Sequence, residues 1–167
     1  MDRIMVIGLQ GAGKSTFAHK LGQGLHRKVI HLDKEYYLFD WKKRFTKVEW
    51  VAFQKKLVKQ KEWIIIEGNY KSTLDIRLAE ADTIIFFDFP KILCIYRIFK
   101  RLFKSGQSFD KAEGIKEKVG FKLLREVLFY PSEEMQHKLD RYKDSKRVIV
   151  LKNSKQVEAT LQALASN

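Results

Sequence analysis

The stretch Gly-Leu-Gln-Gly-Ala-Gly-Lys-Ser-Thr at residues 8–16 decides the fold. It has the spacing Gly-x-x-x-x-Gly-Lys-Ser of a Walker A phosphate loop, a motif that has structural meaning only between a strand and a helix. Both flanks fit, because residues 3–7 read as a short buried strand and residues 17–21 continue as a helix. The context favours a phosphate-binding loop over a glycine-rich turn that matches by chance.

Each part of this loop has an expected role toward a nucleotide. The glycines allow the backbone to turn its N–H groups onto a polyphosphate, and the following helix points its positive dipole end at the same anion. We expect Lys14 to reach the β- and γ-phosphates of ATP and the Ser15 hydroxyl to ligate Mg²⁺. The residues expected to bind the nucleotide here are Gly8, Gly11, Ala12, Gly13, Lys14, Ser15 and Thr16.

Composition limits the class of protein. A chain of 167 residues predicts a single domain, and no apolar run approaches the roughly 20 residues of a membrane span. Cys94 is the only cysteine, so no internal disulfide can form, and we expect a reducing, cytoplasmic location. The 33 Lys and Arg residues exceed the 20 Asp and Glu residues, which favours anionic partners; a solvated lysine-rich surface explains the same excess.

Short apolar runs alternate with helical patterns along the whole chain. This alternation predicts an α/β three-layer domain, covering residues 1–167, around a parallel sheet. Thr46 and Glu49 have the spacing of a capping box at the start of one helix. The predicted strands are residues 3–7, 28–32, 63–66, 83–87 and 147–151. The predicted helices cover residues 17–21, 46–58, 72–80, 91–104, 121–129, 132–142 and the last residues from 153, with a loop at 38–45.

Five segments occur together in a recognisable order: the phosphate loop, Ile30-His31-Leu32-Asp33, residues 63–70, residues 81–90 and residues 147–151. This set resembles the bacterial DNA topology modulation proteins (FlaR type) within the adenylate-kinase-like P-loop kinases. The resemblance implies a P-loop NTPase fold with the strand order 2-3-1-4-5, and ATP and Mg²⁺ as cofactors. It also implies an acceptor-side segment at residues 33–60 and a basic lid at residues 97–120. Glu67 stands where the family usually has Asp, which lengthens the side chain that would reach Mg²⁺ through water.

Candidate acceptor residues follow the second and third predicted strands. Asp33 is our candidate for the base that orients or deprotonates an acceptor hydroxyl; the alternative is that it caps the following helix. Asn69 and Tyr70 would contact the acceptor at the mouth of the same crevice. Arg77 would either hold the acceptor or pair with an acidic residue, Asp75 or Glu80, on its own helix.

The phosphate side has further candidates. Arg97 and Arg101 lie at i, i+4 and match the lid arginines that stabilise charge on a transferring phosphoryl group; the alternative is a solvated helix face. Glu67 would act on Mg²⁺ or accept a hydrogen bond at the end of its strand. Asn153 would hold the adenine through its backbone, or cap the last helix.

Two functions from different classes are open at this point. The first is a Mg·ATP-dependent phosphotransferase that acts on a small molecule, such as a nucleoside or nucleotide. The second is a nucleotide-dependent DNA-binding or DNA topology modulation protein without kinase turnover, which the net charge of +13 supports. The sequence contains no helix-turn-helix or zinc-finger signature that would strengthen the second.

Overall fold

The computed structural model describes residues 2–38, 42–66, 70–103 and 121–165, and its strands form one parallel sheet. The strand order is β2-β3-β1-β4-β5, which confirms the predicted fold class and topology. The strands are β1 (Arg3–Gly8), β2 (Val29–His31), β3 (Trp63–Ile66), β4 (Thr83–Phe87) and β5 (Arg147–Leu151).

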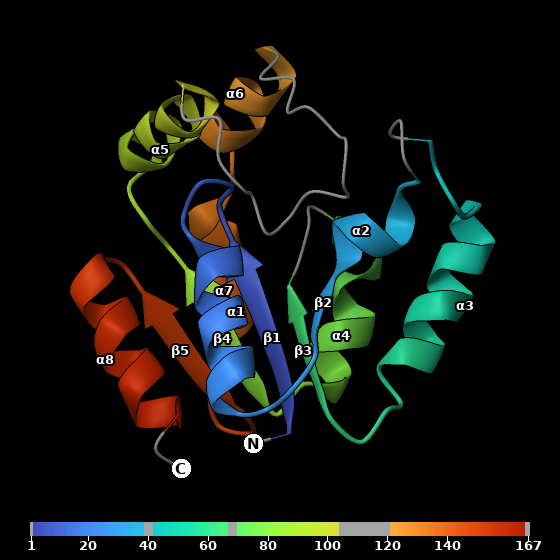
Figure 1. The fold of residues 1–167 in the computed structure, drawn as a ribbon. Coiled ribbons are helices and arrows are strands. Elements are labelled where there is room, and N and C mark those ends of the chain that lie inside the picture. Colours follow the sequence, from blue (N-terminus) through green and yellow to red (C-terminus); the bar gives the residue numbers. More distant parts are fainter. Residues whose placement is uncertain (1, 39–41, 67–69, 104–120, 166–167) are drawn as a thin grey trace.

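Helices cover both faces of this sheet. In Figure 1, α1 and α8 lie on the near face, α4 and α7 lie on the far face, and α5 and α6 lie beyond the carboxyl ends of the strands. The helices are α1 (Lys14–Gly24), α2 (Leu32–Tyr36), α3 (Lys47–Leu57), α4 (Leu74–Glu80) after the short 3₁₀ turn η1 (Lys71–Thr73), α5 (Lys91–Phe103), α6 (Phe121–Leu128), α7 (Ser132–Asp140) and α8 (Ser154–Ala165). None of these helices, within the described residues, is long and apolar enough to cross a membrane.

The central strands are continuously apolar because helices cover them on both sides. All five residues of β4 are buried, and the strand pairs with β1 from Ile4↔Thr83 to Gly8↔Phe87. Since the strands are parallel, their carboxyl ends meet at one edge of the sheet. The segments that follow β1, β2, β3 and β4 are therefore neighbours in space, although they are far apart in the sequence.

The second strand is shorter than predicted. β2 pairs with β3 only through Val29, Ile30 and His31, since β3 itself ends at Ile66, opposite His31. Leu32 is fully buried and begins α2. Asp33 therefore lies in the first turn of a helix rather than directly after a strand.

The predicted capping box is confirmed at the start of α3. The Thr46 hydroxyl accepts a hydrogen bond from the Glu49 amide at 3.3 Å, and the Glu49 carboxylate accepts one from the Thr46 amide at 2.8 Å. The segment before it, predicted as a loop, contains an antiparallel bridge between Tyr37 and Lys43. This bridge brings the chain back from α2 toward α3.

Candidate active site

The phosphate loop packs closely against α5. Gly11 has φ +79°, and a Cβ atom there would lie 2.5 Å from the Cys94 carbonyl oxygen. Gly13 has φ +100° and forms the left-handed N-cap of α1. Neither conformation suits a residue with a side chain. The glycines are thus required for the loop to turn over the start of the helix.

The start of α1 fits a phosphate group. The N-cap residue Gly13 has no side chain that could accept a hydrogen bond from this helix, and the first turn carries no acidic residue. Ser15, half-buried, and Thr16, exposed, lie in this turn. The amide groups in the first turn of a helix and the helix dipole together favour an anion at such a position.

Lys14 places its positive charge at the same loop. Its ammonium donates hydrogen bonds to the carbonyl oxygens of Gly8 at 2.9 Å and Leu9 at 2.8 Å, and the residue is only 9% exposed. The cation is therefore held beside the amides of the α1 N-terminus. This donor set suits the β- and γ-phosphates of ATP.

Arg97 joins the phosphate loop to the start of α8. Its guanidinium donates to the Ala12 carbonyl oxygen at 3.1 Å and to the Ser154 hydroxyl at 3.2 Å, and lies 5.0 Å from the centre of the Phe89 ring. The alternative of a solvated helix face is therefore wrong for Arg97. Arg101 lies one turn further along α5 and is half-buried.

Asp33 and Tyr70 meet on the acceptor side. The Tyr70 hydroxyl donates a 2.9 Å hydrogen bond to Asp33 Oδ1. His31 is the N-cap residue of α2, so the alternative of Asp33 as the cap is wrong. Burial and the Asp33 carboxylate raise the pKa of Tyr70 far above its ordinary value, so the phenol stays a neutral donor.

An aromatic cluster packs against the ring of Tyr70, the hydrogen-bond partner of Asp33. Tyr70 packs against Tyr36 and Trp50, with ring centres 5.2 Å and 5.1 Å away, and Phe45 and Phe53 extend the cluster along α3. Tyr36 and Trp50 are buried, 9% and 4% exposed. The cluster therefore ties α2, α3 and the segment after β3 into one unit.

Arg77 lies inside the protein behind this unit. None of its side chain is exposed, and its guanidinium donates to the Thr73 hydroxyl at 3.0 Å and to the Tyr70 carbonyl oxygen at 3.2 Å. Its predicted acidic partners bind other cations: Asp75 pairs with Lys138, and Glu80 pairs with two basic side chains. In this conformation Arg77 holds the backbone of Tyr70 in place.

Asn153 is the N-cap of α8. Its side-chain oxygen accepts a 3.0 Å hydrogen bond from the Gln156 amide, as the capping alternative predicted. A contact between its backbone and adenine stays a prediction. Glu67 and Asn69, predicted for Mg²⁺ and for the acceptor, lie outside the described residues, as do residues 104–120 of the predicted lid.

Three contacts of this site carry no signal in the sequence. Ser154, at the start of α8, and Phe89, after β4, both contact Arg97. The backbone of Cys94 lies directly against Gly11. Side-chain spacing reveals contacts within one element, whereas these contacts join separate elements.

No family model matches the chain, and no curated protein matches it. Solved structures do. A shikimate kinase from Aquifex aeolicus matches with a TM-score of 0.58 and 18% identity, over 99% of this chain and 97% of that chain. A deoxyadenosine kinase from M. mycoides matches with a TM-score of 0.52 and 16% identity, over 98% of this chain and 99% of that chain. A sugar kinase from Janibacter sp. matches with a TM-score of 0.56 and 15% identity, over 98% of this chain and 89% of that chain.

These likenesses define the class of fold. The chain shares its fold with these kinases and has a five-stranded parallel sheet in the order 2-3-1-4-5. At this level of identity the likeness concerns the fold alone. Activity has to be argued from the site.

Proposed function

We propose that the chain is a cytoplasmic kinase that transfers the γ-phosphate of Mg·ATP to a hydroxyl group of a small molecule. The observation that carries the proposal is the carboxylate of Asp33, held by the Tyr70 hydroxyl at the edge of the sheet where the phosphate loop also lies. Phosphoryl transfer needs an oriented acceptor and a neutralised phosphate chain more than it needs covalent chemistry. At this edge, Asp33 can orient the acceptor, and the phosphate loop can neutralise the phosphate chain.

In this proposal Asp33 accepts the proton of the acceptor hydroxyl, and Tyr70 keeps the carboxylate in position. Lys14 and the amides of the α1 N-terminus hold the phosphates, with Arg97 and Arg101 stabilising the charge that develops during transfer. Mg²⁺, when bound at Ser15, would supply charge neutralisation at the phosphate oxygens. Glu67 and Asn69 are proposed at the metal and acceptor, respectively, on the sequence alone.

The acceptor class follows from the chemistry of Asp33. An acceptor that is itself a phosphate needs no base, whereas a hydroxyl acceptor does. The neighbours in fold that are named as kinases of shikimate, deoxyadenosine and a sugar support a small hydroxyl compound. A nucleoside or a sugar is therefore our first choice of acceptor.

A transfer screen tests this proposal. The protein would be incubated with γ-labelled ATP, Mg²⁺ and a panel of nucleosides, nucleotides, sugars and hydroxy acids, and labelled products would be separated from ATP. We expect one class of hydroxyl compound to be labelled. Asp33→Asn should abolish labelling and leave ATP binding unchanged, while Asp144→Asn, an exposed carboxylate on another part of the chain, should leave both unchanged. Labelling that survives in Asp33→Asn would reject Asp33 as the base.

A DNA-binding protein without turnover is the alternative, and it rests on the net charge of +13 and on the resemblance to FlaR-type proteins. Duplex DNA binding that weakens steeply with salt, together with an absence of transfer to every compound in the screen, would support it. Phosphoryl transfer without DNA binding near physiological salt would reject it.

A further inference from the structure

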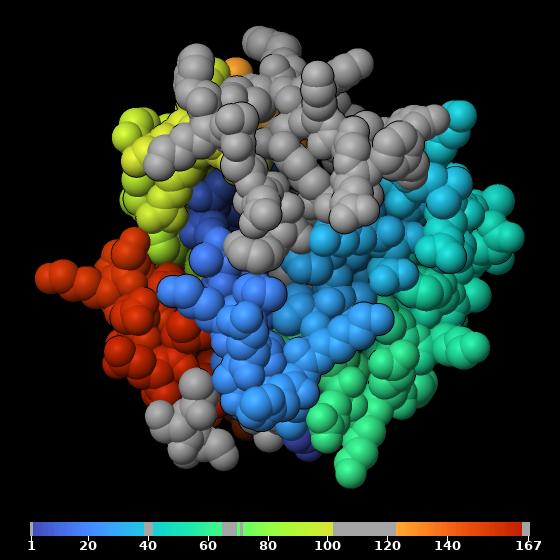
Figure 2. All heavy atoms as spheres, viewed as in Figure 1, coloured from blue at the N-terminus to red at the C-terminus, as the bar shows by residue number. Residues whose placement is uncertain are grey.

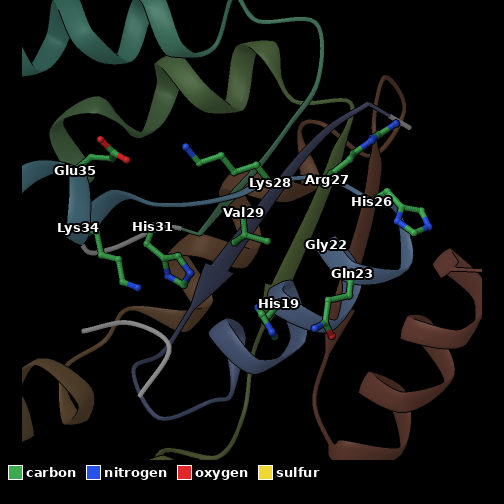
Figure 3. A pocket seen from close by; sticks show the side chains of 10 residues that line it. All are labelled: His19, Gly22, Gln23, His26, Arg27, Lys28, Val29, His31, Lys34 and Glu35. Atoms are coloured by element: carbon green, nitrogen blue, oxygen red, sulfur yellow. The ribbon is translucent and has the colours of Figure 1, made fainter. Parts of the chain in front are cut away.

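A hollow of about 750 Å³ lies beside α1 and shares no residue with the phosphate loop, while Lys34 and Glu35 of its lining directly follow the proposed base Asp33. Figure 2 shows this side of the molecule, with α1 between α8 and the region of β2, α2 and α3. Figure 3 shows the hollow from close by, with side chains entering it from α1, from the α1–β2 connection, and from β2 and α2. It lies at the edge of the sheet, since β2 is the outermost strand.

Histidines gather in this hollow. Three of the four histidines of the chain line it, namely His19, His26 and His31, whereas His137 lies on α7. Among the described residues no group of three His, Cys, Asp or Glu side chains converges to hold a metal ion, so the imidazoles do not form a metal centre. Imidazole N–H groups can donate hydrogen bonds to an anion.

The lining also carries an excess of positive charge. Lys28 and Lys34 are exposed, and neither forms an ion pair with a carboxylate of the described residues. Arg27 at one end is bonded to Asp2 and Glu62, both at 3.1 Å. Only one carboxylate is among the ten lining residues. Such a surface attracts multiply charged anions.

Close packing of α1 on β2 forms the floor of the hollow. A Cβ atom at Gly22 would lie 2.6 Å from Val29 Cγ2 and 2.8 Å from the Arg27 carbonyl oxygen. No larger residue fits there unless α1 moves away from the strand. Gly22 therefore lets α1 lie close to β2 and to the α1–β2 connection at the floor of the hollow.

We propose that this hollow binds a small, multiply charged phosphate compound. The volume falls within the roughly 300–1,000 Å³ of small-ligand sites. The lining contains no Phe, Tyr or Trp, whereas proteins that hold single-stranded nucleic acid stack its bases on aromatic side chains. A compact phosphate chain therefore suits this surface better than a nucleic-acid strand does.

Inorganic tripolyphosphate is the probe, and the ring signals of the histidines in NMR spectra are the readout. These signals come from residues that line the hollow, and the phosphate loop itself contains no histidine. We expect the rings of His19, His26 and His31 to shift on titration and the ring of His137 to stay unchanged.

A pair of charge-matched variants completes the test. Lys28→Glu/Lys34→Glu should weaken tripolyphosphate binding at the hollow at least about tenfold, and Lys55→Glu/Lys56→Glu on α3 should change it less than about threefold. Both variants change the net charge equally, and all four lysines are exposed. The proposal would be overturned if both variants lost tripolyphosphate affinity equally, or if the histidine signals did not respond to the probe. It would also be overturned if a short oligonucleotide bound the hollow more tightly than tripolyphosphate does. The result does not depend on kinase activity.

Discussion

The Tyr70 hydroxyl and the Asp33 carboxylate lie 2.9 Å apart across 37 residues of sequence. This hydrogen bond joins the segment after β3 to α2, and it restricts the rotation of the carboxylate that we propose as the base. Tyr70 is itself held from behind, because Arg77 donates to its carbonyl oxygen at 3.2 Å. The position of the proposed base thus depends on a residue that need not touch the acceptor.

Tyr70→Phe removes only the hydroxyl and keeps the ring in the aromatic cluster. We expect turnover of the labelled acceptor to fall about three- to tenfold, because the carboxylate loses a partner that orients it, while ATP affinity stays unchanged. Steady-state kinetics of the variant and of Tyr142→Phe, a tyrosine near β5, would measure this. A variant as active as the original protein would show that the hydroxyl has no role in positioning.

Lys14→Ala removes the cation of the phosphate loop. Since a hydrogen bond to a charged group contributes about 1.5–3 kcal/mol, we expect Mg·ATP affinity to fall at least about tenfold. Isothermal titration calorimetry measures this directly. Lys20→Ala, at an exposed position of the same helix, is the matched control and should bind Mg·ATP normally. If Lys14→Ala bound Mg·ATP as tightly as the original protein does, the assignment of residues 8–16 as an ATP-binding phosphate loop would be rejected.

Arg97→Lys keeps the positive charge and loses the planar fork that reaches both Ala12 and Ser154. Lysine cannot replace this geometry, so we expect turnover to fall about tenfold or more, with Arg97→Ala only slightly worse. Lys100→Ala on the exposed side of α5 should have little effect. Full activity of Arg97→Lys would mean that charge alone matters at this position.

Lys146 caps the end of α4 from outside that helix. Its ammonium donates to the carbonyl oxygens of Leu78, Ala79 and Ala81 at 2.7, 2.6 and 2.8 Å. Lys146→Met would leave these carbonyls without the donor, and we expect the free energy of unfolding to fall by about 1–3 kcal/mol. Lys143→Met removes only a surface ion pair with Asp140 and should cost less than about 1 kcal/mol. Urea denaturation of both variants would measure these two losses in the free energy of unfolding.

Asp82 makes stability depend on pH at the start of β1. Burial raises the pKa of this carboxyl, but hydrogen bonds from the amides of Asp2 and Arg3 and from the Thr83 hydroxyl outweigh burial and hold the pKa below its ordinary value. A lowered pKa in the folded state stabilises the protein above the unfolded pKa of about 4, and this contribution is lost as the pH falls through the folded value.

At pH 7 we expect the free energy of unfolding of Asp82→Asn to be lower than that of the original protein, by less than about 1 kcal/mol because solvent screens the partly exposed carboxylate, and this difference should disappear below about pH 4. Asp144→Asn is the control, with no such dependence expected. If the difference in the free energy of unfolding between Asp82→Asn and the original protein stayed constant from pH 7 to pH 3, the charge of Asp82 would contribute nothing to stability.

The sequence by itself predicted the fold class, which the structure confirms, and the residues that we propose for the nucleotide side of the site. The glycines, Lys14 and Ser15 lie within nine consecutive residues, and the capping box at Thr46 spans four, so local backbone chemistry defines both. The continuously apolar strands likewise reveal a sheet covered on both faces, because burial acts on each strand directly.

Only the tertiary structure decided which side chains meet. Arg97 and Ala12 are 85 residues apart, and they touch because β4 lies beside β1 in the sheet. Tyr70 and Asp33 meet because β3 lies beside β2, and Arg77 is buried because α4 packs against the sheet. Strand order is a property of the whole chain, since it depends on which apolar faces bury best together. A motif reports only on its own neighbours, so it could place the phosphate of this site but not the partners that surround it.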